Sequence, residues 1–188
     1  MEKDLKQVPS GLLRVVLYGP ESTGKTTLAK QLAAHYQTAW VDEFAREYLQ
    51  KKWDEKREVC AREDLPVIVA GQLQLENQAI AKARQLLFCD TNVVVTRVWS
   101  ETHFDGYCDP LIIACTEQFR YDLYFLTGID VPWEKDDLRD RPDDRQMMFD
   151  YFKDTLDKLQ ENYLVLEGNQ EERFKKAVAA IDLLLKKT

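Results

Sequence analysis

Short apolar runs alternate with longer amphipathic stretches along this chain. The runs end at glycine, proline or charged residues and are too short for helices, so they predict buried strands. We expect five of them, at residues 13–18, 39–41, 86–89, 123–126 and 163–166. Because helical patterns separate them, the strands are expected to pair in parallel.

Apolar residues recur at helical spacing between these runs, as Leu28, Leu32 and Ala33 do. The predicted helices cover residues 25–36, 43–52, 65–84, 92–104, 110–118, 145–160 and 171–186. We expect Asp64 to cap the third, since aspartate accepts hydrogen bonds from the free N–H groups at a helix start. The pattern predicts a three-layer α/β fold, a five-stranded parallel sheet flanked by helices, in one domain over residues 1–188.

The motif G-x-x-x-x-G-K-[ST] stands directly between the first predicted strand and the first helix. Its glycines let the backbone turn its N–H groups toward one centre, where the helix adds its positive end. The predicted nucleotide-binding residues are Gly19, Pro20, Glu21, Ser22, Thr23, Gly24, Lys25, Thr26 and Thr27. Lys25 would reach the β- and γ-phosphates, and we expect it to face solvent before they bind. The alternative is a glycine turn with an incidental lysine.

Asp90 closes the third apolar run. At the end of a buried strand beside the phosphate loop, its carboxylate could bind Mg²⁺ together with the Thr26 hydroxyl. The alternative is that Asp90 caps the following helix with help from Thr91. The motif and Asp90 together predict a site for ATP and Mg²⁺, without deciding what receives the γ-phosphate.

Charged residues follow the second predicted strand. Asp42 and Glu43 stand at its carboxyl end, where parallel sheets bind ligands, and either carboxylate could deprotonate a substrate hydroxyl. Arg46 lies one helical turn after Glu43 and could bind the substrate. The alternative is an exposed, charged helix start. Candidates for stacking on a heterocycle are Trp40, Tyr48, Trp99, Phe104 and Tyr107, with packing in the core as the alternative for each.

The polar segment 129–145 carries two prolines and three arginines, Arg139, Arg141 and Arg145. Guanidinium groups suit phosphate oxygens, and a mobile loop bearing them can close over a triphosphate and exclude water. We therefore predict a lid. The alternative is a solvated loop whose arginines pair with its own aspartates.

Composition excludes several classes of protein. The net charge is −7, from 26 basic and 33 acidic residues, which disfavours a nucleic-acid or membrane-surface binder. The four cysteines form no C-x-x-C pair and there are only two histidines, so a zinc site is not expected. With no apolar leader or membrane-length apolar run, we expect a cytoplasmic protein.

Several of these motifs together resemble the kinase domain of NadR-type proteins. Besides the phosphate loop, the resemblance rests on residues 40–48 (WVDEFAREY), 89–91 (CDT), 98–101 (VWSE), 121–126 (YDLYFL), 131–133 (VPW), 137–139 (DLR) and 172–173 (ER). It extends from about Leu13 to Leu185. The phosphate loop alone is shared by many unrelated nucleotide-binding proteins, whereas the combination is specific.

The resemblance implies ATP- and Mg²⁺-dependent phosphorylation of nicotinamide riboside to nicotinamide mononucleotide. By position, the catalytic residues would be Lys25, Asp42, Glu43 and Arg139, the metal residues Thr26 and Asp90, and the substrate-binding residues Asp42, Glu43, Arg46 and Trp99. Arg139 and Arg141 would contact the nucleotide from the lid, and Asn169 would lie near its adenine.

Two other functions stay open at this stage. One is a kinase for another nucleoside or a small alcohol, and the other is an NTP-hydrolysing regulatory ATPase without a small acceptor. The adenylyl-transfer and DNA-binding segments that precede the kinase in multidomain NadR-type proteins are not expected here, because only about a dozen residues precede the first strand.

Overall fold

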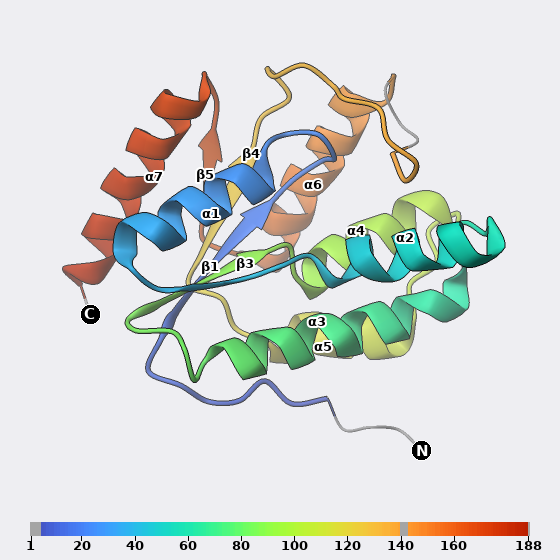
Figure 1. Cartoon of the computed structure of the whole chain (residues 1–188), viewed down its shortest axis with the longest axis horizontal. Coiled ribbons are helices and arrows are strands. Elements are labelled where there is room, and N and C mark those ends of the chain that lie inside the picture. The colour runs from blue at the N-terminus through green and yellow to red at the C-terminus, as the bar shows by residue number, and fades with distance from the viewer. Residues whose placement is uncertain (1–4, 140–142, 188) are drawn as a thin grey trace.

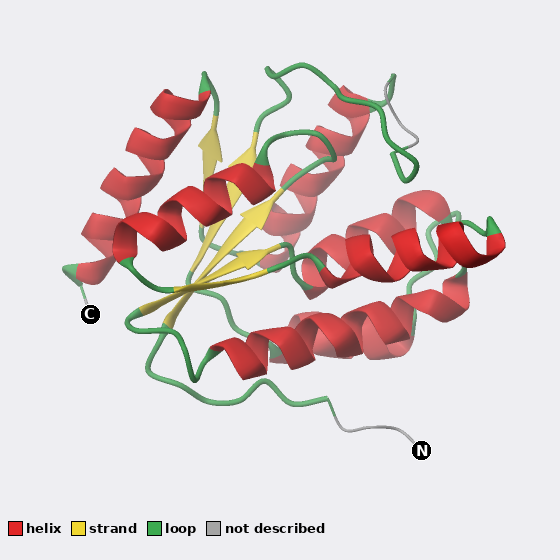
Figure 2. Ribbon diagram, viewed as in Figure 1, coloured by secondary structure: helices red, strands yellow, loops and turns green. Residues whose placement is uncertain are grey.

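The computed structural model describes residues 5–139 and 143–187. Five strands form one parallel sheet in the order β2-β3-β1-β4-β5. The strands are β1 (Leu13–Tyr18), β2 (Ala39–Val41), β3 (Leu86–Asp90), β4 (Leu123–Thr127) and β5 (Tyr163–Leu166). The predicted strands and the three-layer α/β architecture are confirmed (Figure 2).

Helices cover both faces of the sheet. They are α1 (Lys25–Tyr36), α2 (Phe44–Lys56), α3 (Leu65–Ala79), α4 (Val93–His103), α5 (Pro110–Gln118), α6 (Arg145–Leu159) and α7 (Gln170–Leu185). One face is covered by α1 and α7, the other by α3, α4, α5 and α6, and α2 packs on α3 (Figure 1). In the described part of the chain, no helix is long and apolar enough to cross a membrane.

The sheet is apolar on both faces because successive side chains of a strand point to opposite sides. In β1, Val15 and Leu17 belong to the core under α1 and α7, whereas Val16 and Tyr18 belong to the core on the opposite face. All four are fully buried. This double burial explains why the sequence shows continuous apolar runs instead of alternation.

The strand order places the functional residues together. From β1 the chain first builds β2 and β3 on one side and then crosses to β4 and β5 on the other. The carboxyl ends of β1 and its neighbours therefore open onto one crevice, where doubly wound sheets bind their ligands. Gly19, Asp42 and Asp90 all stand at or directly after such ends.

Two helix ends differ from the prediction. Helix α2 continues to Lys56, because residues 53–56 include no helix breaker, and it stops where Arg57 takes a left-handed conformation (φ 58°). Helix α3 already ends at Ala79, where backbone hydrogen bonds from Lys82 and Ala83 to its carbonyl form a turn. That turn returns the chain toward β3.

The prediction that Asp64 caps α3 is wrong. Asp64 itself has helical backbone angles, and no described side chain caps the start of α3. Its carboxylate instead accepts hydrogen bonds from the Ala61 N–H at 2.7 Å, the Tyr48 hydroxyl at 2.8 Å and the Lys52 ammonium at 2.7 Å. Asp64 therefore closes a short 3₁₀ turn (Arg62–Asp64) and ties it to α2.

Candidate active site

The phosphate loop takes the backbone conformation that its glycines permit. Gly19 (φ 130°) and Gly24 (φ 82°) lie in the left-handed region, which strains any other residue. At Gly19 a Cβ would also come within 2.9 Å of the Thr127 hydroxyl. Helix α1 starts at Lys25 with no described side chain capping it, so its first N–H groups are available to an anion.

Lys25 does not face solvent, which corrects that expectation. Its ammonium folds back across the loop and donates to the carbonyls of Gly19 at 3.0 Å and Pro20 at 2.6 Å. Burial lowers the pKa of Lys25, opposed by the negative charges of Glu43 and Asp90. Two backbone oxygens therefore hold the ammonium in place at the mouth of the loop.

Asp90 and Thr26 meet across two elements. The Thr26 hydroxyl donates to Asp90 Oδ2 at 2.5 Å, while Asp90 Oδ1 is buried without a hydrogen-bond partner in the described structure. Burial raises the pKa of Asp90. The alternative role of Asp90 as a cap is wrong, because Asn92 caps α4 by accepting from the Val94 and Val95 N–H groups.

The two carboxylates after β2 have different surroundings. Asp42 is exposed, whereas Glu43 is half-buried and feels the charges of Lys25, Asp90, Arg46 and Arg139. Burial raises the pKa of Glu43, and the negative charge of Asp90 adds to the effect. Glu43 therefore faces the phosphate loop and the end of β3, while Asp42 stands at the rim.

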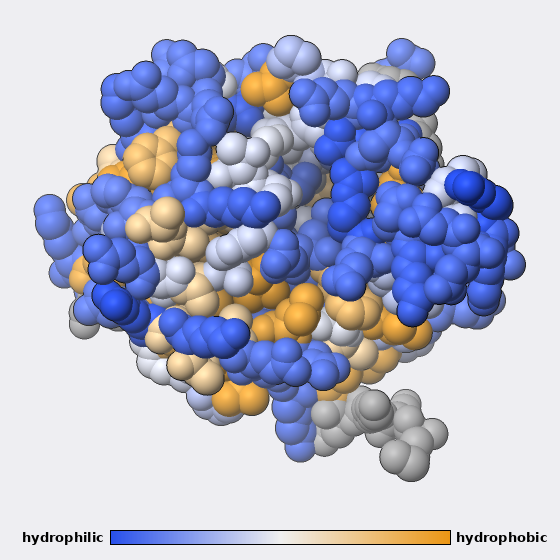
Figure 3. Space-filling model, in the orientation of Figure 1, coloured by the Kyte–Doolittle hydropathy of each residue, from blue (hydrophilic) through white to orange (hydrophobic). Residues whose placement is uncertain are grey.

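A single cavity of about 1010 Å³ joins the phosphate loop to a compartment between α2, α3 and α4. Arg46 and Leu49 line it from α2, Ile68 from α3, and Trp99 from α4, with Phe104 just beyond that helix. Figure 3 shows this face of the molecule hollowed near its centre, with hydrophilic side chains around much of the rim. The compartment is partly aromatic and lies beyond the phosphate loop, as an acceptor pocket requires.

The stacking candidates separate into two groups. Trp99 and Phe104 line the cavity. Trp40 packs instead with the core under α1 and α7, Tyr48 donates to Asp64, and Tyr107 lies beneath Arg62. Core or surface packing is therefore the observed role of these last three residues.

Gln72 belongs to this cavity although the sequence did not single it out. Its side chain is 3 % exposed, and Oε1 accepts the Phe44 backbone N–H at 2.9 Å. A backbone N–H can only donate, so the side-chain atom that it contacts must be the amide oxygen, and the remaining polar atom is the NH₂ nitrogen. This Nε2 has no hydrogen-bond partner among the described residues. Helix α3 also carries Gln74 and Gln78, so residue type alone did not single out Gln72.

The segment after β4 lies over the phosphate loop. Trp133 Nε1 donates to Glu21 at 3.1 Å, and the Glu134 N–H donates to the Ser22 hydroxyl at 2.8 Å. Arg139 lines the cavity, while Arg145 donates to the Val131 carbonyl at 2.8 Å. The predicted Arg141 lies outside the described residues.

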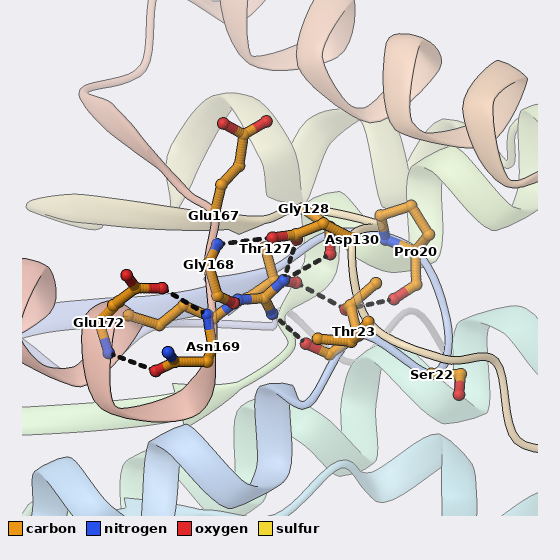
Figure 4. Close-up of polar contacts among 12 residues, drawn as sticks. Pro20, Ser22, Thr23, Thr127, Gly128, Asp130, Glu167, Gly168, Asn169 and Glu172 are labelled. Atoms are coloured by element: carbon orange, nitrogen blue, oxygen red, sulfur yellow. Dashed lines mark hydrogen bonds and ion pairs between the residues drawn. The ribbon is translucent and has the colours of Figure 1, made fainter.

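Arg173 ties three loops together beside the cavity. Figure 4 labels the residues Thr23, Gly128 and Gly168 that accept from it. Its buried guanidinium donates to the carbonyls of Thr23 at 2.7 Å, Gly128 at 3.1 Å and Gly168 at 2.9 Å, and it pairs with Asp130. The phosphate loop is thereby attached to the ends of β4 and β5. From the sequence, Arg173 stood out only as part of a family motif.

Asn169 stands at the start of α7. Its side chain accepts the Glu172 N–H at 3.0 Å, and Glu172 accepts the Asn169 N–H at 2.8 Å, so the two form a capping box (Figure 4). The next residue, Gln170, lines the cavity.

Comparisons with known proteins agree with this geometry. The family model AAA_28, described as an AAA domain, matches residues 14–173. The chain is 30 % identical over 125 residues to the trifunctional NAD biosynthesis/regulator protein NadR of Salmonella typhimurium and, equally, to that of Escherichia coli. Each match covers 66 % of this chain but 30 % of the relative. The resemblance to NadR-type proteins is confirmed.

Solved structures share the fold. A NadR protein in complex with NR matches with a TM-score of 0.75 at 21 % identity, over 91 % of this chain and 51 % of that one. A NadR protein with NAD and AMP-PNP gives 0.72 at 21 % identity, over 91 % and 49 %. Thymidylate kinase from Ehrlichia chaffeensis gives 0.64 at 13 % identity, over 92 % and 100 %.

Proposed function

This chain belongs to the AAA_28 family, and from that premise we propose that it is a kinase that transfers the γ-phosphate of ATP to a hydroxyl of a small nucleoside. One observation carries the proposal: a single cavity has a phosphate loop at one end, a partly aromatic compartment at the other, and Glu43 between them. A nucleotide triphosphate and a second small molecule would fit end to end in it.

The residues at the ends of β3 and α1 suit Mg²⁺. Thr26 and Asp90 present hard oxygen ligands, and the buried Asp90 Oδ1 lacks a partner among the described residues. These two residues would hold the ion, which would neutralise charge on the β- and γ-phosphate oxygens. Lys25 and the amides of α1 would bind the same phosphates, with Lys25 leaving the Gly19 and Pro20 carbonyls to do so.

Glu43 is the carboxylate that we assign to the acceptor hydroxyl. A base must lie between the phosphate and the acceptor. The charges that act on Glu43 are those of Lys25 and Asp90 near the phosphate loop and of Arg46 on α2. A raised pKa also brings a carboxylate closer to the operating pH, which improves proton transfer. Asp42, at the exposed rim, would contribute to acceptor binding.

Nicotinamide riboside is the acceptor that we propose. The curated relatives are NAD biosynthesis proteins, and a structural relative was solved with NR. The cavity offers Trp99 and Phe104 for stacking on a pyridine ring, and the buried Gln72 Nε2 for the oxygen of its carboxamide. Arg46 would complete the pocket from α2.

The test is a kinase assay with the purified chain. ADP formation from ATP and Mg²⁺ is measured alone and with nicotinamide riboside, thymidine, deoxyadenosine, uridine or shikimate. We expect turnover only with an acceptor, and the highest kcat/KM with nicotinamide riboside. If only another nucleoside supports turnover, the kinase assignment stands and nicotinamide riboside is not the acceptor. Steady hydrolysis unaffected by every acceptor would instead indicate a regulatory ATPase.

The proposal extends to the protein's setting. We expect one kinase domain acting in the cytoplasm, where ATP is available and where its four cysteines, all free, stay reduced. Its partners would be ATP and the nucleoside, without nucleic acid or membrane.

A further inference from the structure

We propose that Asp136 is a positioning residue that couples acceptor binding to closure of the lid. It holds Arg46 of α2 and Arg139 of the lid in one hydrogen-bonded group. The inference rests on the proposed function, because it takes Arg46 to lie on the acceptor side and Arg139 on the phosphate side of the cavity.

Both carboxylate oxygens of Asp136 are engaged by Arg46 and by the turn that carries Arg139. Oδ2 accepts from Arg46 Nη2 at 2.5 Å and pairs with Arg139 Nε at 3.1 Å. Oδ1 accepts the backbone N–H groups of Leu138 at 2.9 Å and Arg139 at 3.0 Å. One carboxylate thus fixes both the turn that carries Arg139 and the direction of its side chain, and it attaches them to a helix about ninety residues away in the chain.

The charges favour this arrangement. Burial alone would raise the pKa of Asp136, but the hydrogen bond from Arg46 and the further contacts outweigh it and lower the pKa. The pKa of Arg46 is raised, first through the same hydrogen bond. The side chains of Arg46 and Asp136 are 41 % and 29 % exposed, so water screens the pairs and they add little stability. Orientation is their larger effect.

The two arginines come from different elements, α2 and the segment after β4, and meet at Asp136 Oδ2 beside the cavity. Arg139 is close enough to Lys25 to disfavour its charged form, and Arg46 acts on Glu43 from α2. The base of the lid is held separately, by Trp133 on Glu21. Among the described residues, Asp136 therefore acts on the placing of Arg139, whose guanidinium also donates to the Glu134 carbonyl at 2.6 Å. An acceptor that holds Arg46 in place would also hold Asp136 in place. Asp136 would then keep Arg139 directed toward the triphosphate.

Such a link must act in both directions, since coupling between two binding sites is reciprocal. Kd for AMP-PNP with Mg²⁺ is therefore measured with and without saturating nicotinamide riboside. For the natural chain we expect the acceptor to tighten AMP-PNP by roughly five-fold or more, the lower end of common coupling factors. In Asp136→Asn the factor should fall to about one, within the error of the assay.

Asp136→Asn is a narrow change. Its side-chain oxygen can still accept the Leu138 and Arg139 N–H groups, so the turn is kept while the charge shared by the two arginines is lost. Without acceptor, the Kd for AMP-PNP should rise by less than the coupling factor, because the base of the lid is untouched. Asp143→Asn removes one charge from the same exposed segment and should keep the natural coupling factor. Asp136→Glu should restore part of the coupling.

An unchanged coupling factor in Asp136→Asn would overturn the proposal. If the natural chain binds no nicotinamide riboside, the acceptor assignment falls, and the link is tested without it. Arg46→Ala and Arg139→Ala are then combined in a double-mutant cycle on AMP-PNP affinity. We expect a non-additive result in the natural chain and an additive one in the Asp136→Asn background. Additivity in both backgrounds would overturn the coupling, whichever molecule is the acceptor.

Discussion

At the scale of single residues, adjacent side chains acquire different chemistry from their surroundings. Asp42 and Glu43 follow the same strand, and nothing in their order separates a base from a rim residue. The difference comes from their surroundings: Lys25 at the start of α1 and Asp90 at the end of β3 act on the half-buried Glu43, whereas Asp42 is exposed. Sequence patterns could therefore predict a pair of carboxylates here, but not which one is buried.

Glu43→Gln keeps the shape of the side chain and removes the carboxylate that we propose as the base. We expect kcat to fall by about 10²- to 10⁴-fold, the usual range for general-base catalysis, while KM for ATP stays nearly constant. Because Glu43 works when ionised and its pKa is raised, the natural enzyme should lose activity on acidification earlier than an ordinary carboxylate would. The pH profile of kcat/KM should lose that limb in the variant.

Asp42→Asn is the matched control for this experiment. We expect a change in KM for the acceptor and little change in kcat. A large loss of kcat in Asp42→Asn, with near-normal turnover in Glu43→Gln, would move the base by one residue and refute the assignment to Glu43.

Lys25→Ala should abolish phosphoryl transfer. The ammonium would stabilise charge that develops on the phosphates, an electrostatic contribution of several kcal/mol. Stability should change little, because burial of the charge already opposes the two hydrogen bonds to Gly19 and Pro20. Turnover at saturating ATP and Mg²⁺ is measured beside Tm, and near-normal turnover would refute the phosphate site.

At the scale of elements, the short apolar runs made every strand predictable. Burial on both faces leaves little choice of residue in β1, β3 and β4, whereas the edge strands β2 and β5 are only partly buried. Helix ends were harder. The side chain of Asp64 suits the start of α3 by type, yet Tyr48 and Lys52 compete for its carboxylate from α2. Whether a side chain caps a helix depends on its neighbours in space, and these cannot be read from the spacing of residues along the chain.

The proposed lid, residues 129–145, can be tested through Arg139. Arg139→Ala should lower kcat more than it raises KM for ATP, because an arginine on a closing loop contributes most after closure. Steady-state kinetics with each substrate varied would measure both effects. If kcat and kcat/KM both stay at their natural values, the segment is only a solvated loop, the alternative that the sequence left open.

At the scale of the whole molecule, one buried acid is not among the residues that line the cavity. Glu76 on α3 is 1 % exposed, and both of its oxygens accept the Tyr121 hydroxyl, at 3.2 and 3.1 Å. Burial raises its pKa to about 8, against an ordinary value of 4.5. The folded chain therefore holds a proton here that the unfolded chain releases.

This proton makes stability depend on pH. Below about pH 4.5 Glu76 is protonated in both the folded and the unfolded chain. As pH rises toward about 8, the unfolded chain releases this proton while the folded chain keeps it, so folding becomes less favourable. The free energy of unfolding should decline over that window by up to roughly 1.4 kcal/mol per pH unit. In Glu76→Gln, which still accepts from Tyr121, the decline should become shallower, with a remainder from other buried carboxylates of raised pKa such as Glu43 and Asp90. Urea titrations of both proteins at several pH values measure it, and parallel pH profiles would contradict the expectation.

The contacts of Arg173 set the order in which the nucleotide site is completed. Synthesis proceeds from the N-terminus, so the phosphate loop leaves the ribosome long before α7 does. Until then the Thr23 carbonyl lacks the guanidinium that fastens it to the ends of β4 and β5. A nascent chain thus carries the whole phosphate-binding motif without the brace that holds its shape. We therefore expect ATP binding to begin only when α7 docks, so that growing chains would not sequester nucleotide.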